Sequence, residues 1–396
     1  MTFAGVIAWI AAAWWLAAIG FVILSIAAAF LQPFVQRRRA RGKDLPPVSL
    51  VVPVKAFDAG FVRAQESLLA QSYPHAELLV SAVEEDSHAL RAIRELVARY
   101  PKLPARILHS SGRFAASPKL NNLVEPFREA RHDVIFMKDS NTILAPGDLE
   151  AAVRQLTAEV GLVVAVPVAT GAENFAARME ESIMNGAHAR ALMTASLFRR
   201  EVGVGKFMLF RRCDLDRAGG IAALAWTVGE DNAMGKALAS LGLQTVFSHR
   251  IVRQELGSRR FSDVYDRQMR WAVIRRDEER AAFVAEPLSF ALPAALAAGL
   301  AAPLAGIAPL AAVLATILGW FGLETLLTAI KGWGFSLAAP TAFVAREIML
   351  PCVWLNAWLT NSVVWAQGTY VAKPASVPPV GPVLGSLGLV RRDGDP

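Results

Sequence analysis

The stretch Val48-Ser49-Leu50-Val51-Val52-Pro53-Val54 decides how most of this chain folds. It is short, apolar and rich in valine, which is typical of a strand that is buried on both faces. From here to about residue 250, runs of this kind alternate with longer segments of helical pattern. The alternation predicts an α/β fold with a mainly parallel sheet and helices on both faces. We expect further strands at 77–83, 106–109 and 133–137, and helices at 61–71, 88–99 and 119–129.

Two aspartates come directly after strands of this predicted sheet. Asp86 follows the strand at 77–83, and Asp139 follows Val134-Ile135-Phe136-Met137. Because ligands bind at the carboxyl ends of parallel strands, we expect both acids at one edge of the sheet. Asp139 could bind a divalent cation that bridges the phosphates of a nucleotide, or it could only cap the next turn. Asp86 is open to the same two interpretations.

Two further segments carry polar groups that suit a phosphorylated ligand. Pro118-Lys119-Leu120-Asn121-Asn122 offers a cation and two amides for phosphate or uracil, although an ordinary helix start looks the same. Glu230-Asp231 stands at the head of a predicted helix. There Asp231 is either a first-turn acid or a general base for an acceptor hydroxyl. Both segments belong to residues 45–250, which we expect to be the catalytic domain.

Arg267-Gln268-Met269-Arg270-Trp271 forms a cationic and aromatic cluster. In a helix, Arg267 and Trp271 lie on one face and Arg270 is about one turn from Arg267. Two guanidinium groups can hold a diphosphate, and an indole offers a flat wall for a ring or a lipid chain. Basic helices beside membranes are common, so the motif alone is a weak signal. We expect the segment 251–286 to lie at a membrane surface.

The composition indicates a membrane protein. Of the 396 residues, 54% are hydrophobic and only 19% are charged, which is rare for a soluble protein of this length. Residues 3–31 contain no charged side chain, and five cations follow at 37–43. We therefore expect residues 1–32 to be a retained anchor that leads into the cytoplasm. A signal peptide carries its cations before the apolar run, which makes that alternative weaker.

The C-terminal part turns apolar again and predicts transmembrane or interfacial helices over 287–370. Residues 287–309 and 310–330 are expected to form a hairpin of two spans, with prolines at its tip. The apolar segment 352–365 is short, so it could cross the membrane, re-enter it or lie in its interface. The tail 371–396 is rich in Pro and Gly and is predicted to be disordered.

Charged residues inside and beside these apolar segments point to partners. Glu324 lies within the predicted hairpin, where an ionised carboxylate is costly unless paired, and we expect Arg346 to be its partner. The net charge of +7 could indicate nucleic acid, but the cations cluster beside apolar segments and no nucleic-acid-binding motif accompanies them. Cys213 and Cys352 match no metal-binding spacing and are expected to be free thiols. The Ala- and Arg-rich composition favours a bacterial inner membrane.

Taken in order, these residues resemble the ceramide glucosyltransferase family over roughly residues 1–374. Two departures stand out: Glu84-Glu85-Asp86 is not the family's aspartate-rich version, and Lys206 stands where the family usually carries an uncharged residue. The resemblance is carried by the three aspartates Asp86, Asp139 and Asp231, each with its neighbours, and by the R-x-x-R-W motif. The other matching segments are Val48 to Lys55, Pro118 to Asn122, Phe175-Ala176-Ala177, His188, Leu215 to Gly220, Arg346-Glu347, Trp365 and Gly368-Thr369-Tyr370; the neighbours are Ser140 after Asp139 and Glu230 before Asp231.

This resemblance implies a Rossmann-like transferase domain of the GT-A type, with transmembrane helices at both ends. It implies that a hexose, glucose foremost, moves from a UDP-sugar to the primary hydroxyl of ceramide with inversion, and that Mg²⁺ or Mn²⁺ is the cofactor. The implied roles of the aspartates are a nucleotide contact for Asp86, metal and diphosphate binding for Asp139, and the catalytic base for Asp231. Arg267, Arg270 and Trp271 would bind the diphosphate and close the site. His188 and Glu230 would bind the acceptor.

Other functions remain open at this point. The same chemistry could act on diacylglycerol, a phospholipid or a polyprenyl phosphate, or could use galactose, glucuronate or N-acetylglucosamine as the donor sugar. A processive polysaccharide synthase also uses R-x-x-R-W, but it needs a channel made from more spanning helices than this chain offers. A non-catalytic membrane scaffold would have no use for all the acids and both arginines.

Overall fold

The computed structural model describes residues 2–39, 42–110, 115, 117–334, 339–365 and 368–371. By their internal contacts these residues divide into two compact units. We call the unit that comprises Met1–Pro33, Pro167–Phe198 and Gln254–Ala372 the helical unit. The other, with Phe34–Val166 and Arg199–Arg253, is the sheet unit. Two of the boundaries fall inside the long strands β6 (Val160–Ala172) and β8 (Gln244–Gly257), and another falls within the N-terminal helix, after Pro33. The domain limits expected from the sequence stay a prediction.

The first half of the sheet unit is the alternating pattern that the sequence predicts. The strands lie in the order β3-β2-β1-β4, and all neighbouring pairs among them are parallel. Every one of these elements lies within two residues of its expected position, so this part of the α/β fold is confirmed. The elements are β1 (Val48–Val54), α2 (Phe61–Leu69), β2 (Ala76–Ala82), α3 (His88–Ala98), β3 (Ala105–His109), α4 (Pro118–Glu129) and β4 (Val134–Lys138).

The second half of the sheet is different, because β7 (Phe207–Arg211) pairs antiparallel with both β4 and β6. The expectation of a mainly parallel sheet is therefore wrong for this half, and the sheet is mixed. The reason is that β7 enters the sheet at the end where β4 leaves it, with Phe207 paired to Lys138. The order continues from β4 as β7-β6-β8-β5. The remaining elements of this unit are β5 (Thr142–Ile143), α5 (Asp148–Val153), α8 (Arg212–Arg217), η2 (Ile221–Leu224) and α9 (Glu230–Ala239).

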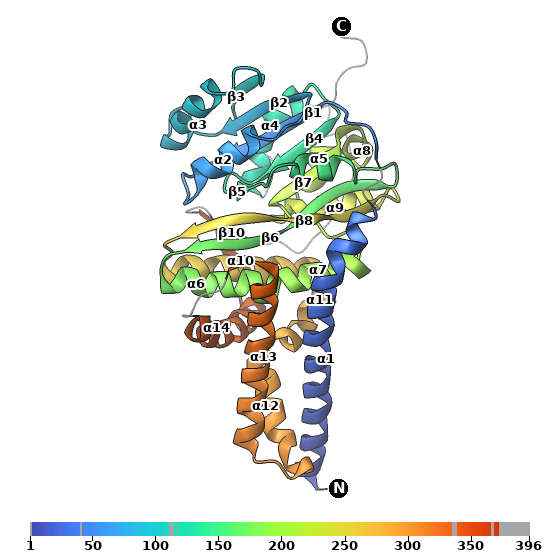
Figure 1. Ribbon diagram of the computed structural model, residues 1–396, viewed down its shortest axis with the longest axis vertical. Coiled ribbons are helices and arrows are strands. Elements are labelled where there is room, and N and C mark those ends of the chain that lie inside the picture. The colour runs from blue at the N-terminus through green and yellow to red at the C-terminus, as the bar shows by residue number, and fades with distance from the viewer. Residues whose placement is uncertain are drawn as a thin grey trace. The chain divides into compact units, whose positions relative to one another are not determined.

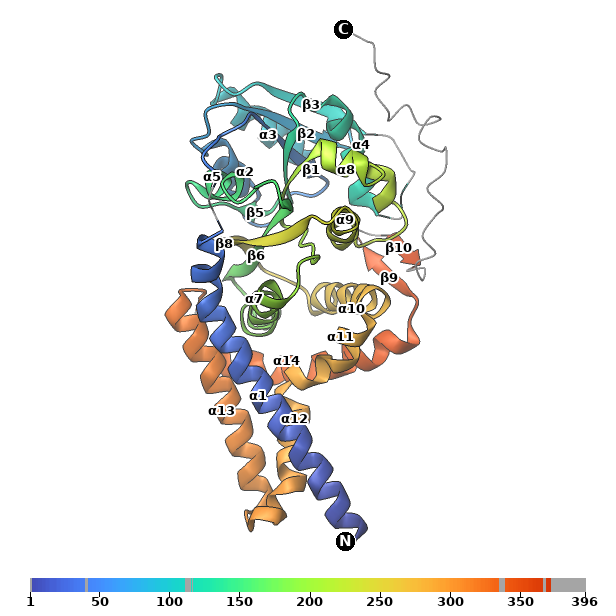
Figure 2. The ribbon, with the colours of Figure 1, turned by 90° about the vertical axis from the view of Figure 1, so that its right-hand side faces the viewer.

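Helices cover both faces of the parallel strands (Figure 2). Val48, Leu50, Val52 and Val54 alternate along β1 and pack into one core with side chains of α2, α3 and α5. Helix α4 packs against β1 and β2 outside this core. Its Asn122 donates hydrogen bonds to the carbonyls of Val54 and Ser81 at 3.1 and 3.2 Å. These bonds fix the beginning of α4 at the carboxyl edge of the sheet.

The helical unit contains the N-terminal helix α1 (Phe3–Arg37) and the predicted hairpin of α12 (Ala291–Ala301) and α13 (Pro309–Lys331). The short helix η4 (Ala302–Ala305) lies at the tip of the hairpin. In both ribbon views α1 runs beside the hairpin (Figures 1 and 2). The Trp15 indole N–H donates to the Thr316 hydroxyl at 3.1 Å, which joins α1 to α13. α12 and α13 pack against each other as the expected hairpin, whereas the expectation that both segments span the membrane stays a prediction.

Among the described residues, three helices are long and apolar enough to cross a membrane, namely α1, α13 and α14 (Ala339–Leu359). A bent pair of helices at Arg280–Ser289 and Ala291–Ala305 would count as a fourth span. Figures 1 and 2 show α14 running crosswise to α1 and α13. Whether α14 crosses a membrane or lies in its interface stays a prediction.

The predicted segment 352–365 is not one element. Its first part is the end of α14, and its last part is β9 (Ser362–Trp365), which pairs antiparallel with β10 (Gly368–Val371). Whether this segment crosses the membrane, re-enters it or lies in its interface stays a prediction. Beyond residue 371, the predicted disordered tail lies outside the described residues.

The remaining helices of this unit position the residues of interest. α6 (Phe175–Ser182) continues through the π-helix η1 (Ile183–His188) into α7 (Ala189–Phe198). α10 (Phe261–Glu278) packs against α6 and α14, and is followed by α11 (Arg280–Ala285) and η3 (Glu286–Ser289). An apolar cluster joins these elements and includes Met179, Ile183, Val264, Met269 and Met349.

Candidate active site

Asp231 lies in the first turn of α9, and its carboxylate is held in place by backbone groups. One carboxylate oxygen, Oδ2, accepts a hydrogen bond from the Gly205 N–H at 2.7 Å, and Oδ1 accepts one from the Asn232 N–H at 2.9 Å. The loop 203–206 approaches α9 so closely that a Cβ atom on Gly203 would lie 1.8 Å from the Asp231 carbonyl oxygen. Only glycine fits there, and this close approach delivers Gly205 to the carboxylate.

Lys119 lies in the first turn of α4 and makes three polar contacts through its ammonium group. The nitrogen Nζ is 2.7 Å from Asp139 Oδ1 and 3.2 Å from Glu230 Oε1, and it donates to the Gly205 carbonyl at 3.0 Å. Burial alone would lower the pKa of Lys119, but Asp139 and Glu230 outweigh it and the pKa is raised. Lys119 is therefore a permanent cation.

Asp139 follows β4 directly, as predicted, and lies between two ammonium groups. Its second oxygen, Oδ2, is 2.9 Å from Lys206 Nζ. Burial would raise the pKa of Asp139, but Lys119 and Lys206 outweigh burial and hold the pKa well below its ordinary value. The Asp139 side chain is still 27% exposed. We call Lys119, Asp139, Lys206, Glu230 and Asp231 the aspartate–lysine cluster.

Ser117 and Lys138 were absent from the predicted site, and Glu230, a member of the cluster, carried another role in it. Glu230, expected at the acceptor, is buried and accepts a hydrogen bond from the Ser117 hydroxyl at 2.8 Å. Burial is the largest cause of the raised pKa of Glu230. Lys138 is fully buried, donates to the carbonyls of Asp139 and Thr142, and has a pKa lowered by burial to about 7. Two features of the sequence could have indicated these contacts: Ser117 directly before Pro118, and Lys138 at the end of an otherwise apolar strand.

Asp86 and Asn121 make other contacts. The Asp86 carboxylate is 64% exposed and forms ion pairs with Arg91 at 2.8 Å and Arg94 at 3.7 Å. Within the described part of the chain, no hydrogen bond or ion pair links Asp86 to the aspartate–lysine cluster. The Asn121 amide holds residue Ala115 by accepting from its N–H at 2.9 Å and donating to its carbonyl at 3.0 Å. The nucleotide-binding roles of Asp86 and Asn121 stay predictions.

The R-x-x-R-W motif lies on α10 in the helical unit, and helix geometry places Arg267 and Trp271 one turn apart as expected. The Arg267 guanidinium forms an ion pair with Glu180, whose side chain is fully buried. Arg270 Nη1 donates to the Val364 carbonyl at 3.4 Å. The Trp271 ring lies 5.3 Å from the His188 ring, measured between centroids. Diphosphate binding by the two arginines stays a prediction.

His188 is the last residue of the π-helix η1. Burial lowers its pKa to about 3, and the cations Arg275, Arg346 and Arg190 contribute in the same direction. The imidazole is therefore neutral at physiological pH. A neutral ring beside Trp271 can donate and accept hydrogen bonds, so it suits a polar uncharged ligand rather than a phosphate.

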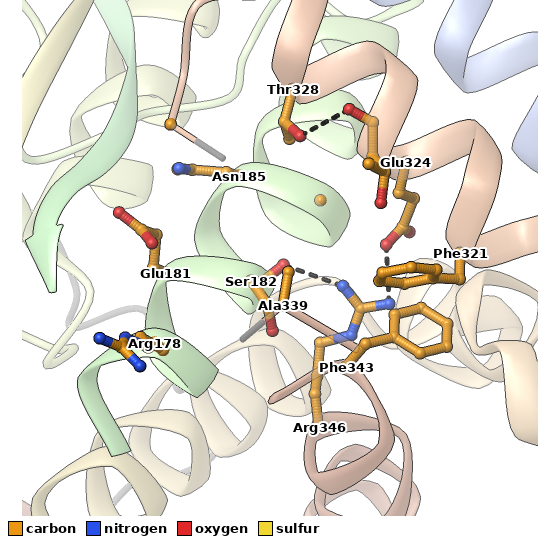
Figure 3. A pocket seen from close by; sticks show the side chains of 13 residues that line it. Arg178, Glu181, Ser182, Asn185, Phe321, Glu324, Thr328, Ala339, Phe343 and Arg346 are labelled. Atoms are coloured by element: carbon orange, nitrogen blue, oxygen red, sulfur yellow. Dashed lines mark hydrogen bonds and ion pairs between the residues drawn. The ribbon is translucent and has the colours of Figure 1, made fainter. Parts of the chain in front are cut away.

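The predicted pair of Glu324 and Arg346 is confirmed, at 2.8 Å between Oε2 and Nη2. It belongs to a larger group, because Glu324 Oε1 also lies 3.1 Å from Arg190 Nη2. Figure 3 shows the Arg346 guanidinium between Glu324 and Ser182, whose carbonyl accepts a hydrogen bond at 2.9 Å. A Cβ atom on Gly186 would lie 2.7 Å from both charged groups, so a side chain at this point of η1 would displace one of them.

Glu347 completes this group. Its Oε1 is 2.6 Å from Arg346 Nη2, and its Oε2 accepts from the N–H groups of Ala291 and Leu292 at the start of α12. We call Arg190, Glu324, Arg346 and Glu347 the arginine–glutamate network. It joins α7, α13, α14 and α12, and every member is buried.

Asp139, the residue that we expected to bind a metal ion, is paired with an ammonium group at each of its carboxylate oxygens. Asp139 Oδ2 and Asn141 Oδ1 both lie within 3.0 Å of the Lys206 ammonium, and Asp139 Oδ1 is paired with Lys119. Among the described residues, no group of three or more His, Cys, Asp or Glu side chains is arranged to hold a metal ion. The donor set as it stands does not fit a divalent cation, because an ammonium group lies where the ion would bind.

The comparisons with known proteins identify the family of this chain. The profile of glycosyl transferase family 21 matches residues 12–376. The chain belongs to glycosyl transferase family 21. It is therefore a glycosyltransferase, and the resemblance to the ceramide glucosyltransferase family is confirmed.

Two curated family 21 relatives come from Caenorhabditis elegans. Ceramide glucosyltransferase 3 is 24% identical over 358 residues, which cover 88% of this chain and 78% of the relative. Ceramide glucosyltransferase 1 is 25% identical over 335 residues, which cover 82% and 72%. Among solved structures, a mannosyltransferase from Pyrobaculum calidifontis in complex with GDP-Man and Mn²⁺ covers 87% of this chain and 99% of its own, at 16% identity and a TM-score of 0.49.

Proposed function

We propose that this family 21 enzyme transfers a hexose, with glucose as the first candidate, from a UDP-sugar to the primary hydroxyl of ceramide. The product is a glycosylceramide, and the anomeric configuration is inverted. The names of the two nematode relatives support the sugar and the acceptor. Galactose, glucuronate or N-acetylglucosamine as donor, and diacylglycerol, a phospholipid or a polyprenyl phosphate as acceptor, would use the same chemistry.

The observation that carries this proposal is the placement of Asp231. Its carboxylate is fixed by the Gly205 N–H, and the same glycine's carbonyl accepts a hydrogen bond from Lys119. The Asp231 carboxylate and the Lys119 ammonium group are therefore both hydrogen-bonded to Gly205. They lie beside Asp139, at the carboxyl edge of the parallel strands. A base for the acceptor and a cation for the diphosphate are the two groups that a direct sugar transfer needs.

The reaction follows from these two groups. The acceptor hydroxyl oxygen attacks the anomeric carbon, while the bond from that carbon to the β-phosphate oxygen breaks and its electron pair leaves with UDP. The hydroxyl proton passes to the Asp231 carboxylate. Lys119 offsets the charge that develops on the leaving diphosphate. Attack from the face opposite the leaving group inverts the anomeric carbon.

The sequence predicts Mg²⁺ or Mn²⁺ at Asp139, where such an ion would offset negative charge on the donor diphosphate. This cofactor stays a prediction, and no step of the proposed reaction passes through it.

For the acceptor, we propose the helical unit. The predicted groove is bounded by 253–280, His188 and 343–355. Support comes from the Trp271–His188 ring contact and from the packing of α10 on α14. A neutral imidazole and an indole suit the amide and hydroxyl headgroup of ceramide.

We also propose that the sheet unit is cytoplasmic. Arg37 ends the apolar helix α1, and Arg38 and Arg39 follow it. Lys and Arg residues next to a membrane span are enriched on the cytoplasmic side. A UDP-sugar donor is available on that side. The bacterial inner membrane stays a prediction from composition, and the two relatives described above come from a nematode.

The experiment uses the purified full chain in lipid nanodiscs. Ceramide is supplied with labelled UDP-glucose, UDP-galactose, UDP-glucuronate or UDP-N-acetylglucosamine in separate reactions, and lipid products are identified by mass spectrometry. We expect one hexose on ceramide, with UDP-glucose the best donor. Parallel reactions with diacylglycerol and polyprenyl phosphate provide the acceptor control.

Three outcomes would contradict the proposal. A faster reaction with another lipid would replace the acceptor, and a product longer than one hexose would indicate a polysaccharide synthase. Binding of UDP-sugar without any lipid product would leave a non-catalytic membrane protein.

A further inference from the structure

The ammonium group of Lys206 lies between two side-chain oxygens of a type that often binds divalent cations. Its Nζ lies 2.9 Å from Asp139 Oδ2 and 3.0 Å from Asn141 Oδ1. A carboxylate oxygen and a side-chain carbonyl oxygen, two residues apart after a strand, are typical ligands of Mg²⁺, Ca²⁺ or Mn²⁺. Here the same pair of oxygens holds an ammonium ion.

The fold, and not only the side chain, places Lys206 there. Lys206 directly precedes β7, and the register of β7 against β4 pairs Phe207 with Lys138. The Asp139 N–H also donates to the Lys206 carbonyl at 3.4 Å. The backbone on both sides of the ion pair is therefore tied together, so Lys206 would have to swing its whole side chain away to free the two oxygens.

A divalent ion and this ammonium group compete for one position. Two cations at one carboxylate oxygen repel each other strongly unless another anion is present. The other Asp139 oxygen is already paired with Lys119 at 2.7 Å. Unless the donor diphosphate is bound as that further anion, a metal ion could therefore enter only by displacing a lysine.

We propose that Lys206, in place of a divalent metal ion, supplies the positive charge at Asp139 and Asn141, and that its ammonium group contacts the donor diphosphate. This inference rests on the proposed function for the nature of the donor. The Lys206 side chain is 16% exposed, so it can reach a ligand at the edge of the sheet. In the reaction, Lys206 offsets the charge on the diphosphate as the electron pair leaves with UDP.

The test measures UDP binding, which needs neither a sugar nor an acceptor. Calorimetric titrations use the purified full chain in EDTA, and again with Mn²⁺ or Mg²⁺ added. The variants are Lys206→Met, Lys206→Arg and, as a matched control on the surface, Lys102→Met. We expect the wild-type chain and Lys102→Met to bind UDP in EDTA, with little change when metal is added.

Lys206→Met should bind UDP about ten- to a hundredfold more weakly in EDTA, the range for loss of a charge-assisted contact. Added Mn²⁺ should recover part of this loss, because the substitution frees two oxygens that can bind the ion. Lys206→Arg should keep the metal-free binding. Thermal unfolding of each variant without ligand shows whether it is folded. If Lys206→Met does not fold, the wild-type titration in EDTA and Lys206→Arg still decide.

The inference is overturned if wild-type binding is lost in EDTA and restored by Mn²⁺, or if Lys206→Met binds UDP as tightly as the wild type in EDTA. Either result leaves the proposed sugar transfer standing, since transfer is measured separately on ceramide. Conversely, metal-free UDP binding that depends on Lys206, without any lipid product, would support this inference and contradict the proposed function. Absence of UDP binding under every condition would overturn both.

Discussion

The aspartate–lysine cluster of the sheet unit and the arginine–glutamate network of the helical unit contain the same kinds of group but differ in exposure. In the network, the side chains of Arg190, Glu324 and Arg346 are at most 5% exposed. In the cluster, Asp139 is 27% exposed and Lys206 16%. The network joins residues within α13 and α14 to the beginnings of α7 and α12, whereas the cluster stands at the ends of strands and the first turns of helices.

This difference separates a structural group from a reactive one. A buried set of charges with every partner in place has no contact left for a substrate, and removing one member leaves an uncompensated charge. Partly exposed charges at the carboxyl edge of a sheet can exchange protein partners for a ligand. A count of charged residues in the sequence does not distinguish a structural group from a reactive one. The exposure of the side chains and the elements that carry them do.

The largest effect should come from Asp231→Asn, which keeps the shape of the side chain but removes the base. Turnover should fall by about a hundredfold to ten-thousandfold, while UDP-sugar binding changes little. Initial rates of glycosylceramide formation and a UDP titration measure the two quantities. Asp44→Asn, at an exposed position, is the matched control and should leave both unchanged. Equal losses of binding and turnover would make Asp231 a donor ligand and weaken the comparison.

In the network, Glu324→Gln should reduce stability by about 3–5 kcal/mol, because it leaves Arg190 and Arg346 without their shared anion. Thermal unfolding in detergent measures this loss. Exchanging the pair, with Glu324→Arg and Arg346→Glu together, should not restore stability. The introduced arginine would face Arg190, and the introduced glutamate would face Glu347.

This expectation revises the one that follows from the sequence alone, in which Glu324 and Arg346 form an isolated pair and the exchange partly restores stability. Recovery of more than half of the lost stability in the double variant would show that Arg190 and Glu347 contribute little. The network would then reduce to one pair.

A smaller effect should appear with pH through His188. Its pKa is about 3 in the folded chain and about 6.5 when unfolded, so the unfolded state binds a proton first as the pH falls. The stability that the neutral ring contributes is fully present above about pH 6.5 and is lost progressively toward pH 3. By about pH 5 the loss should be at most about 2 kcal/mol, less where solvent reaches the ring.

Unfolding temperatures at about pH 7.5 and about pH 5 measure this loss, and His188→Gln should shrink the difference between them. Exposed His75, changed to Gln, is the control and should leave the difference as in the wild type. If His188→Gln loses as much stability on acidification as the wild-type chain, then the ring is not held neutral by its surroundings.

Much of the sheet unit could be predicted because local patterns determine it. The strand at Val48–Val54 and the alternation after it placed Asp139 at the end of β4, and Lys119 at the start of α4. The pair of Glu324 and Arg346 could also be predicted, since a carboxylate in an apolar helix needs a cation and few are available.

What could not be predicted depends on contacts between distant segments. Lys206 stood out in the sequence only as a cation at an unusual place, and its contact with Asp139 follows from the antiparallel pairing of β7 with β4. No local pattern distinguishes Arg190 from other helical arginines, because its partner Glu324 lies on a helix far along the chain. Strand direction and helix packing are set by the whole fold, so no local pattern reveals them.

The most direct test of the distinction between the two charged groups is UDP binding by Lys119→Met and by Glu324→Gln, each measured on folded protein isolated by size exclusion. We predict that Lys119→Met weakens UDP binding about tenfold or more. Glu324→Gln should lower the unfolding temperature and leave the Kd for UDP unchanged. Loss of UDP binding in folded Glu324→Gln, together with unchanged binding in Lys119→Met, would contradict the assignment of the reactive group to the sheet unit.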